Sequence, residues 1–466
     1  MKLYIYLKTN RREIAPRFVE MINKGDLSMT VMNGFDAHVT DILKNNKGTA
    51  LQYLLFDSSG EDLAYGNISL SDKERYDRDT VYGIASVTKS FVALSVMMLR
   101  KRGLLDTEDP VKEYIPEFTG KNMERPLLIR HLLTHTGGFY PLKRILLGDV
   151  AKKLDIQDSL ESGLEYDPVI ADTGTRMVAE RLDEEKYHIA LPGQQMSYCN
   201  DGYALLSEIV KRVSGKPSFA SFIEDEIFMP LHMERSNLGF LRNSLDDNAA
   251  LLRTYENGVL TEDRDYIRDA FVLSGTGGIK STVNDLKKYV LMYLHRGSEL
   301  GLEGSLIDEM LIPRVLTSPG TQYCYGLEHY TAGDHEIYTH SGSLPGVSSA
   351  ISFSYDQGTG LIMLSNTMGI PVSALSRELM TELSREMIFP YDARFTGTYE
   401  SGEDDDLEIL AGDGPVLKKG NDMIKMRPSG KLSLRSPDDS LLLRFLENDQ
   451  GSIYAVRYGS RIFRKN

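Results

Sequence analysis

Hydrophobic periodicity predicts several helices along the first 390 residues. Phe35, Val39, Ile42 and Leu43 recur at helical spacing, which is typical of a short amphipathic helix. Residues 86–103 are apolar on nearly every side, close with basic residues and stop at a glycine, so they predict a buried helix. Further helices are predicted over residues 127–134, 202–213 and 372–388.

Strands are predicted in two groups. Apolar runs on either side of a turn predict a hairpin over residues 51–68. Three later strands are predicted over residues 336–341, 347–355 and 360–365. An order of strands, helices, strands and a helix indicates an α+β fold, in which an antiparallel sheet is flanked by helices and carries a helical subdomain.

The pattern changes near residue 390. From there on, short alternating stretches are separated by turns about every ten to fifteen residues, which predicts a small all-β, barrel-like domain. We therefore expect an N-terminal extension over residues 1–33, a main domain over residues 34–389 and the barrel-like domain over residues 390–466.

Composition and charge narrow the classes of partner. The 466 residues are 41% hydrophobic and 26% charged, as in folded globular proteins. The 53 basic and 67 acidic residues give a net charge of −14, which disfavours nucleic acid and anionic membranes as partners. A neutral or cationic small substrate suits this charge better.

Cysteine use and the amino terminus indicate a cytoplasmic protein. Cys199 and Cys324 are far apart and match no metal spacing, so we expect two free thiols. The apolar run from Leu3 to Leu7 is too short for the core of a signal peptide. No stretch approaches the roughly 18 apolar residues that a membrane span needs.

Ser86 and Lys89 open the predicted buried helix three positions apart, which places both side chains on one face. Serine is a poor nucleophile unless a neighbouring base takes its proton, and a lysine kept neutral can do so. The unpaired N–H groups at a helix start can also stabilise an oxyanion. The simpler alternative is a serine that caps the helix beside a solvated lysine.

Tyr198 and Asn200 precede another predicted helix and stand two apart, so in an extended segment they point the same way. A phenol can shuttle a proton, and an amide can orient a lysine or a substrate carbonyl. The alternative is that both are structural groups at a helix start.

A short run of residues 340–343 at the end of a predicted strand contains His340, Gly342 and Ser343. A strand that passes a nucleophile can offer an N–H donor, and a glycine allows a close approach. The alternative is a structural or surface histidine. The similar runs that begin at His135 and His295 follow helices and are expected to be helix ends.

We expect neither a metal nor a cofactor. His131 and His135 are four apart on a predicted helix, but Leu132 stands where a zinc protease has its glutamate. The glycines of residues 275–278 lack the spacing of a phosphate-binding loop.

Taken together, the order and setting of the three motifs resemble the serine β-lactamase-like hydrolases. This group includes class C β-lactamases, D-alanyl-D-alanine carboxypeptidases, D-aminopeptidases and related esterases. Recurrent phrases of the family are similar to residues 131–138 (HLLTHTGG), 277–282 (GGIKST) and 325–327 (YGL). The resemblance covers residues 35–389.

The resemblance implies a role for each motif. Ser86 would form an acyl-enzyme, Lys89 and Tyr198 would share the proton transfer, and Asn200 would orient them. The main-chain N–H groups of Ser86 and Ser343 would form the oxyanion hole.

The third motif departs from the family's usual form. It often begins with a lysine whose charge helps to hold a substrate carboxylate, whereas here it begins with His340. We expect this histidine to be only partly charged near pH 7. The histidine form is similar to that of D-aminopeptidases and some esterases, which favours substrates without a required carboxylate.

The sequence therefore predicts a metal-independent serine hydrolase that cleaves amide or peptide bonds of small peptides, including those with D-residues. An esterase with the same residues is the close alternative, and a catalytically silent peptide-binding protein is the third. A complete set of Ser86, Lys89, Tyr198 and Asn200 argues against silence. The oligomeric state is left open, and a homo-oligomer is compatible with the sequence.

Overall fold

The computed structural model describes most of the chain. The described residues are 27–71, 75–140, 145–156, 168–238, 246–256, 259–263, 274–333, 335–386, 391–402, 405–412, 414–430, 432–437, 440–448, 450–459 and 461–466. Most of the predicted N-terminal extension and the predicted boundary at 389–390 lie outside them.

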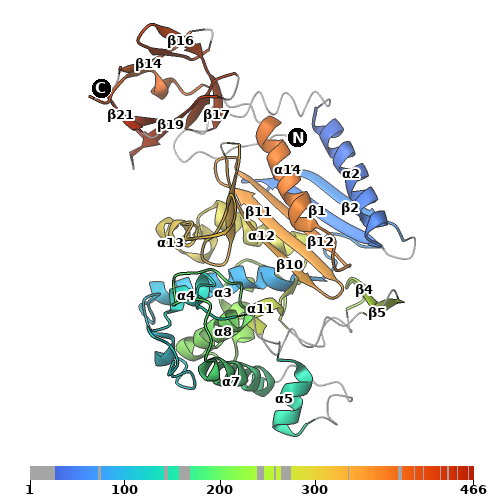
Figure 1. Cartoon of the computed structure of the whole chain (residues 1–466). Coiled ribbons are helices and arrows are strands. Elements are labelled where there is room, and N and C mark those ends of the chain that lie inside the picture. Colours follow the sequence, from blue (N-terminus) through green and yellow to red (C-terminus); the bar gives the residue numbers. More distant parts are fainter. Residues whose placement is uncertain are drawn as a thin grey trace.

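An eight-stranded antiparallel sheet forms the centre of the molecule (Figure 1). Its order is β2-β1-β12-β11-β10-β9-β8-β7, so the predicted N-terminal hairpin joins the late strands through β1 and β12. The bounds of the strands are β1 Ala50–Asp57, β2 Asp62–Ser69, β7 Val315–Ser318, β8 Thr321–Tyr323, β9 Glu328–Ala332, β10 His335–Leu344, β11 Val347–Ser354 and β12 Thr359–Ser365.

Helices cover both faces of this sheet. Helices α2 (Leu27–Asn45) and α14 (Val372–Glu386) cover one face, and α3 (Thr88–Lys101) and α12 (Val283–Leu294) lie on the other (Figure 1). Strand β1 shows the consequence. Tyr53 packs into the core formed with α2 and α14, and its neighbour Leu54 packs into the core formed with α3 and α12. All eight residues of β1 are buried, as expected for a strand covered on both sides.

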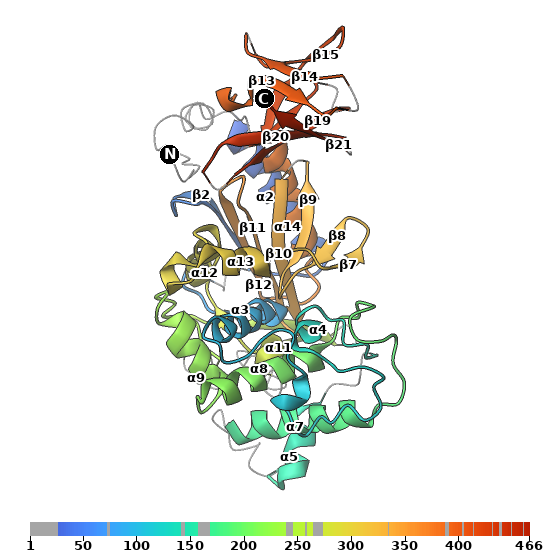
Figure 2. The same cartoon turned by 90° about the vertical axis from the view of Figure 1, so that its left-hand side faces the viewer.

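A helical subdomain packs below the sheet, and α3 lies between the two (Figures 1 and 2). One continuous hydrophobic core runs from the sheet through α3 into α7 and α8, which fixes the two parts against each other. The helical elements are η2 Val111–Glu113, α4 Ile129–Leu133, α5 Leu147–Leu154, α7 Pro168–Glu184, α8 Asn200–Ser214, α9 Phe219–Ile223, the π-turn η3 Glu224–Phe228 and α11 Ser274–Gly277.

Short elements join these parts. They are η1 Ala85–Val87, η4 Ser298–Leu300, α13 Gly304–Met310, and the strand pairs β3 Tyr82–Gly83 with β6 Lys280–Ser281 and β4 Leu252–Glu256 with β5 Val259–Asp263. The predicted helices are confirmed, although α3 begins at Thr88 with Ser86 in the turn η1 before it, α4 is shorter than predicted and α14 is described only to Glu386.

A nine-stranded antiparallel sheet follows, with a core of its own (Figure 2). Strands β16 and β17 lie at opposite edges, yet only Met426 separates them, so the sheet curls into a nearly closed barrel. The strands are β13 Gly397–Glu400, β14 Leu407–Leu410, β15 Val416–Lys419, β16 Asp422–Lys425, β17 Arg427–Gly430, β18 Ser433–Arg435, β19 Leu442–Glu447, β20 Ile453–Tyr458 and β21 Arg461–Lys465, after the turn η5 Ala393–Phe395.

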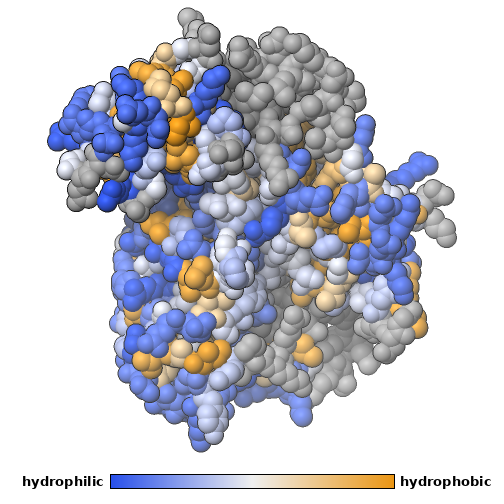
Figure 3. Space-filling model, turned by 45° about the horizontal axis from the view of Figure 1, so that its top comes forward, coloured by the Kyte–Doolittle hydropathy of each residue, from blue (hydrophilic) through white to orange (hydrophobic). Residues whose placement is uncertain are grey.

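The architecture is thus the predicted α+β fold with a barrel-like C-terminal sheet. On the face shown in Figure 3, hydrophilic residues surround a narrower strip of hydrophobic ones on the barrel. Among the helices in the described ranges, none has the length and apolar character required to cross a bilayer.

Candidate active site

Ser86 lies in a tightly held turn at the start of α3. The preceding residue, Ala85, has a φ of 46°, a left-handed conformation that costs an L-residue about 1 kcal/mol or more. Neighbouring strands hold this turn, because the Ile84 N–H donates to the Ile279 carbonyl at 3.0 Å and the Ser349 hydroxyl donates to the Ile84 carbonyl at 2.6 Å. The strained turn leaves Ser86 partly exposed between buried neighbours.

Lys89 lies one turn further along and is fully buried. Its Nζ donates to the Ser86 Oγ at 3.1 Å and to the main-chain carbonyl of Thr276 at 2.8 Å. The lysine is therefore not the solvated side chain of the simpler alternative. It has a direct hydrogen-bond route for the proton of the serine hydroxyl.

Tyr198 brings a phenol to the same place from the segment before α8. The Lys89 Nζ lies 4.9 Å from the centre of the Tyr198 ring. Tyr198 is 38% exposed, so it is open to solvent beside the buried lysine. Asn200 is the first residue of α8 and is half-buried, and its orienting role stays a prediction.

His135 is the residue that sequence analysis placed at a helix end without a chemical role. It does follow α4, with a φ of 57°, but its ring is buried against Tyr198 at a centroid distance of 4.3 Å. Its Nδ1 accepts the main-chain N–H of Cys199 at 3.1 Å, so the neutral ring carries its proton on Nε2. That Nε2 is buried without a hydrogen-bond partner.

The charge of this imidazole is also fixed by its surroundings. Burial first, and then the charge of Lys89, hold the pKa of His135 well below its usual range. A signal for this residue was present in the family-like phrase around it, although its spacing alone indicated only a helix end.

His340 lies beneath the site on β10. Its Nδ1 donates to the Ser341 carbonyl at 2.8 Å, and its Nε2 accepts the Tyr323 hydroxyl at 3.0 Å. Burial, together with the charge of Lys89, lowers the pKa of His340 to about 3. The expectation of a partly charged histidine near pH 7 is therefore wrong, because desolvation keeps this ring neutral.

Gly342 allows β10 to approach the nucleophile turn. A Cβ at this position would lie 2.3 Å from the Ile84 carbonyl oxygen and 2.9 Å from the Ala85 Cβ. Only a glycine permits such an approach without a shift of the main chain.

Ser343 presents its N–H to the open edge of β10. Leu344 and Val347 flank the two-residue turn of the β10–β11 hairpin, so they form the hydrogen-bonded pair, and Ser343 and Ser348 form the next, non-hydrogen-bonded pair. The Ser343 N–H therefore points away from β11, and the register with β9 ends at Thr339. This direction suits a second oxyanion donor beside Ser86.

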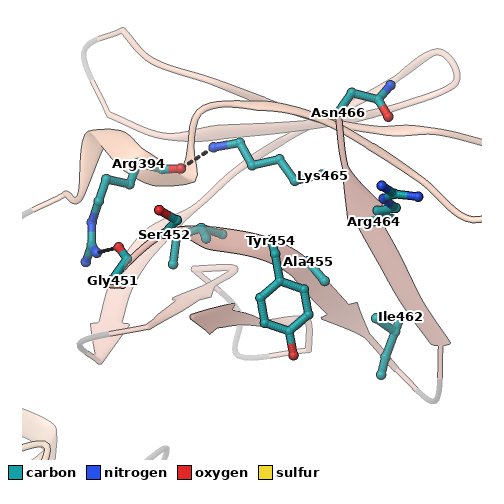
Figure 4. Close-up of a pocket in the computed structure, with 10 residues that line it drawn as sticks. Arg394, Gly451, Ser452, Tyr454, Ala455, Ile462, Arg464, Lys465 and Asn466 are labelled. Carbon is teal, nitrogen blue, oxygen red and sulfur yellow. Dashed lines mark hydrogen bonds between the residues drawn. The ribbon is translucent and has the colours of Figure 1, made fainter. Parts of the chain in front are cut away.

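Two pockets of similar size lie elsewhere on the described surface. One, of about 890 Å³, is on the barrel beside β20 and β21 (Figure 4). There the Arg394 guanidinium bonds to the Gly451 carbonyl, and Lys465 donates to the Arg394 carbonyl. The other, of about 880 Å³, lies beside the candidate site.

Both cysteines are free, as predicted, and both are buried. Burial raises the pKa of Cys199 to about 11 and that of Cys324 to about 12, so neither is a reactive thiolate near pH 7.

Comparison with known proteins gives one consistent result. A family model described as beta-lactamase matches residues 54–383. Penicillin-binding protein 4* of Bacillus subtilis (strain 168) is 26% identical over 359 residues, which span 70% of this chain and 73% of that protein.

Solved structures show the same fold. The octameric penicillin-binding protein homologue from Pyrococcus abyssi matches with a TM-score of 0.64 and 23% identity, over 93% of this chain and 100% of that one. A D-stereospecific amidohydrolase from Streptomyces sp. matches with a TM-score of 0.56 and 18% identity, over 72% of this chain and 94% of that one.

Proposed function

This chain belongs to the β-lactamase family and is a serine hydrolase, and we propose that it cleaves amide bonds of small peptides through an acyl-enzyme on Ser86. The observation that carries the proposal is the hydrogen bond of 3.1 Å between the Lys89 Nζ and the Ser86 Oγ, with the ring of Tyr198 beside the lysine. D-residue peptides are the first substrates to test, because a structural neighbour is a D-stereospecific amidohydrolase.

In the proposed acylation, the Ser86 Oγ attacks the carbonyl carbon and its proton passes to Lys89 and Tyr198. The N–H groups of Ser86 and Ser343 stabilise the oxyanion that forms. The C–N bond then breaks, and the same proton is delivered to the leaving amine. In deacylation a water molecule gives one proton to Tyr198 and Lys89 and attacks the acyl carbon. The bond between that carbon and the Ser86 Oγ then breaks, the acid is released, and the proton from the water restores the Ser86 hydroxyl.

An esterase is the second candidate, and the neutral His340 is compatible with it. A lysine at this position would offer a fixed charge to a substrate carboxylate, whereas a buried imidazole with a pKa of about 3 offers none. Esters and amides without a carboxylate next to the scissile bond therefore suit the part of the site around His340 equally well.

The test of the acyl-enzyme is labelling with a fluorophosphonate, followed by intact-protein and peptide mass spectrometry. We expect one adduct, on Ser86, that Ser86→Ala abolishes. Ser452→Ala, which removes an exposed hydroxyl from the barrel, serves as the matched control and should keep the adduct. A native chain that gains no adduct on Ser86 would overturn the proposed acyl-enzyme.

A turnover screen then separates the two enzyme classes. The screen compares D- and L-aminoacyl anilides, short D-residue peptides and short-chain esters, each with Ser86→Ala as the blank. Turnover of amides by the native chain supports the peptidase, and turnover confined to esters replaces it with the esterase.

A further inference from the structure

The pocket beside the candidate site lies in the groove between the two halves of the main domain. Residues from the helical subdomain form one wall and residues around β7 and β8 form the other. The described lining residues are Arg125, Arg130, His131, Thr134, Thr136, Pro192, Gly193, Gln194, Gln195, Met196, Ile312, Pro313, Arg314, Val315, Leu316, Gln322 and Tyr325.

The chain connects this pocket to the candidate site at three points. Met196 is two residues before Tyr198, Thr136 follows His135, and Gln322 precedes Tyr323. The pocket thus continues the groove at one side of the site, where the distal part of a bound substrate would lie.

The charge of the pocket is opposite to that of the protein. Arg125, Arg130 and Arg314 line it, and none of its described lining residues is acidic, although the chain carries a net charge of −14. A concave site lined by charges of one sign concentrates ligands of the other sign.

The guanidinium groups keep donors for a ligand. Arg130 forms an ion pair with Glu108 at 3.2 Å, and its side chain remains 43% exposed. Arg125 donates to the Pro192 carbonyl at 3.4 Å, and Arg314 donates one Nη2 bond of 2.9 Å to the Glu309 carbonyl. A guanidinium has five N–H donors, so these contacts do not use them all.

His131 adds an uncharged donor. Its Nδ1 accepts the Leu128 N–H at 3.1 Å, so the proton of the neutral ring is on Nε2. Burial, followed by the charges of Arg130 and Arg125, lowers the pKa of His131 to about 4. Gly193 lies over this nitrogen, and a Cβ there would be 3.0 Å from it.

The remaining wall is apolar and open. Ile312 is 49% exposed and Leu316 is 66% exposed, and both line the pocket together with Met196. Exposed apolar side chains beside unpaired donors fit a ligand that is itself part apolar and part anionic.

We propose that this pocket binds an organic carboxylate with an apolar portion, as the distal end of the substrate. Arg130 and Arg314 hold the carboxylate, and Ile312 and Leu316 contact the apolar portion. The carboxylate site stands on the pocket itself, whereas its assignment to the substrate rests on the proposed function.

The test measures binding without turnover. The Ser86→Ala chain is titrated with N-acetylphenylalanine and with its amide, which differs only in lacking the charge. We expect the acid to bind about tenfold more tightly than the amide, because hydrogen bonds to a charged group are worth about 1.5–3 kcal/mol. This preference should fall as the salt concentration rises.

Variants then locate the site. Arg314→Gln, at an exposed position, should reduce the preference several-fold, and Arg314→Gln with Arg130→Gln should abolish it. Arg457→Gln removes an equal charge from an exposed position on the barrel and should leave it unchanged. Thermal melting checks that each variant is folded.

Equal binding of acid and amide to the unaltered pocket would overturn the carboxylate site, as would a preference that survives in the double variant. These outcomes are distinct from failure of the proposed function, because acylation of Ser86 is measured on another chain with another probe. If the native chain is acylated, the link to the substrate is tested with two esters that differ only at the distal end, where one has a carboxylate and the other a carboxamide. Equal kcat/KM values for the two esters would overturn that link.

Discussion

Two groups of basic side chains, one around Lys89 and one in the barrel pocket, differ in what surrounds them. Arg394 of the barrel pairs with Asp392 and Glu447, and the hydrogen bond to Asp392 is the main reason that its pKa is raised further above the usual range. Lys89 instead donates to a hydroxyl and a main-chain carbonyl, beside the ring of Tyr198.

The difference separates a structural charge from one that can take part in chemistry. A cation held by carboxylates keeps its proton and fixes its neighbours. A lysine that is hydrogen-bonded to neutral groups loses its proton at a smaller cost, and in its neutral form it can accept the proton of the serine hydroxyl. The histidines near Lys89 are held neutral, which keeps further charges away from this exchange.

The largest effect on activity is expected when the basic side chain of each region is replaced. Lys89→Gln should lower kcat by about a thousandfold, because general base catalysis contributes about 10²–10⁴. Arg394→Gln should leave kcat unchanged and lower the melting temperature. Steady-state kinetics and thermal melting of both variants provide the measurement. Equal loss of activity in both would remove the distinction.

A methyl group tests how closely each region is packed. Gly342→Ala places a Cβ against the Ile84 carbonyl, so the nucleophile turn or β10 must shift. We expect kcat to fall about a hundredfold, as when an oxyanion donor is displaced.

Gly430→Ala on the barrel is the matched control for this shift. Its Cβ meets the Ser433 Oγ at 2.7 Å, and that hydroxyl can rotate away. Its kcat should therefore equal that of the native enzyme. The packing argument fails if Gly342→Ala has native activity.

Acid should reveal the neutral state of His340. Its pKa is about 3 in the folded state and about 6.5 in an unfolded chain, so the unfolded state binds more protons between these values. Stability is therefore lost as the pH falls from about 6.5 towards 3, by about 2 kcal/mol per such histidine at pH 5.

Urea denaturation at pH 7 and pH 5 measures this loss. His340→Gln, which stays uncharged, should lose about 2 kcal/mol less than the native chain between the two values. His131, with a pKa of about 4, keeps its own contribution in both chains. Identical losses would mean that His340 is not held neutral.

The smallest effect concerns His135, which acts as a positioning residue for Tyr198. His135→Asn keeps a residue that tolerates the left-handed backbone but removes the ring from Tyr198. We expect kcat to fall about tenfold with KM nearly unchanged, because a misplaced phenol slows proton transfer and not binding.

His232→Asn is the control, since His232 also has a left-handed φ of 55° but is exposed. It should have native kinetics. A parallel loss in His232→Asn, or a change confined to KM in His135→Asn, would contradict the positioning role.

Local rules predicted much of this protein. The period of apolar residues located α3, α8, α14 and the strands β10–β12, because one face of each element must be buried. A spacing of three was sufficient to place Ser86 and Lys89 together, since helix geometry fixes which side chains meet.

Contacts between distant segments decided the rest. His135 and Tyr323 become part of the site only because α4, the segment before α8 and β8 converge there. The neutral state of His340 depends on burial, which no spacing along the chain reveals. In the same way, the net charge did not indicate the basic pocket, because charge is summed along a chain but a ligand meets only the side chains that the fold gathers.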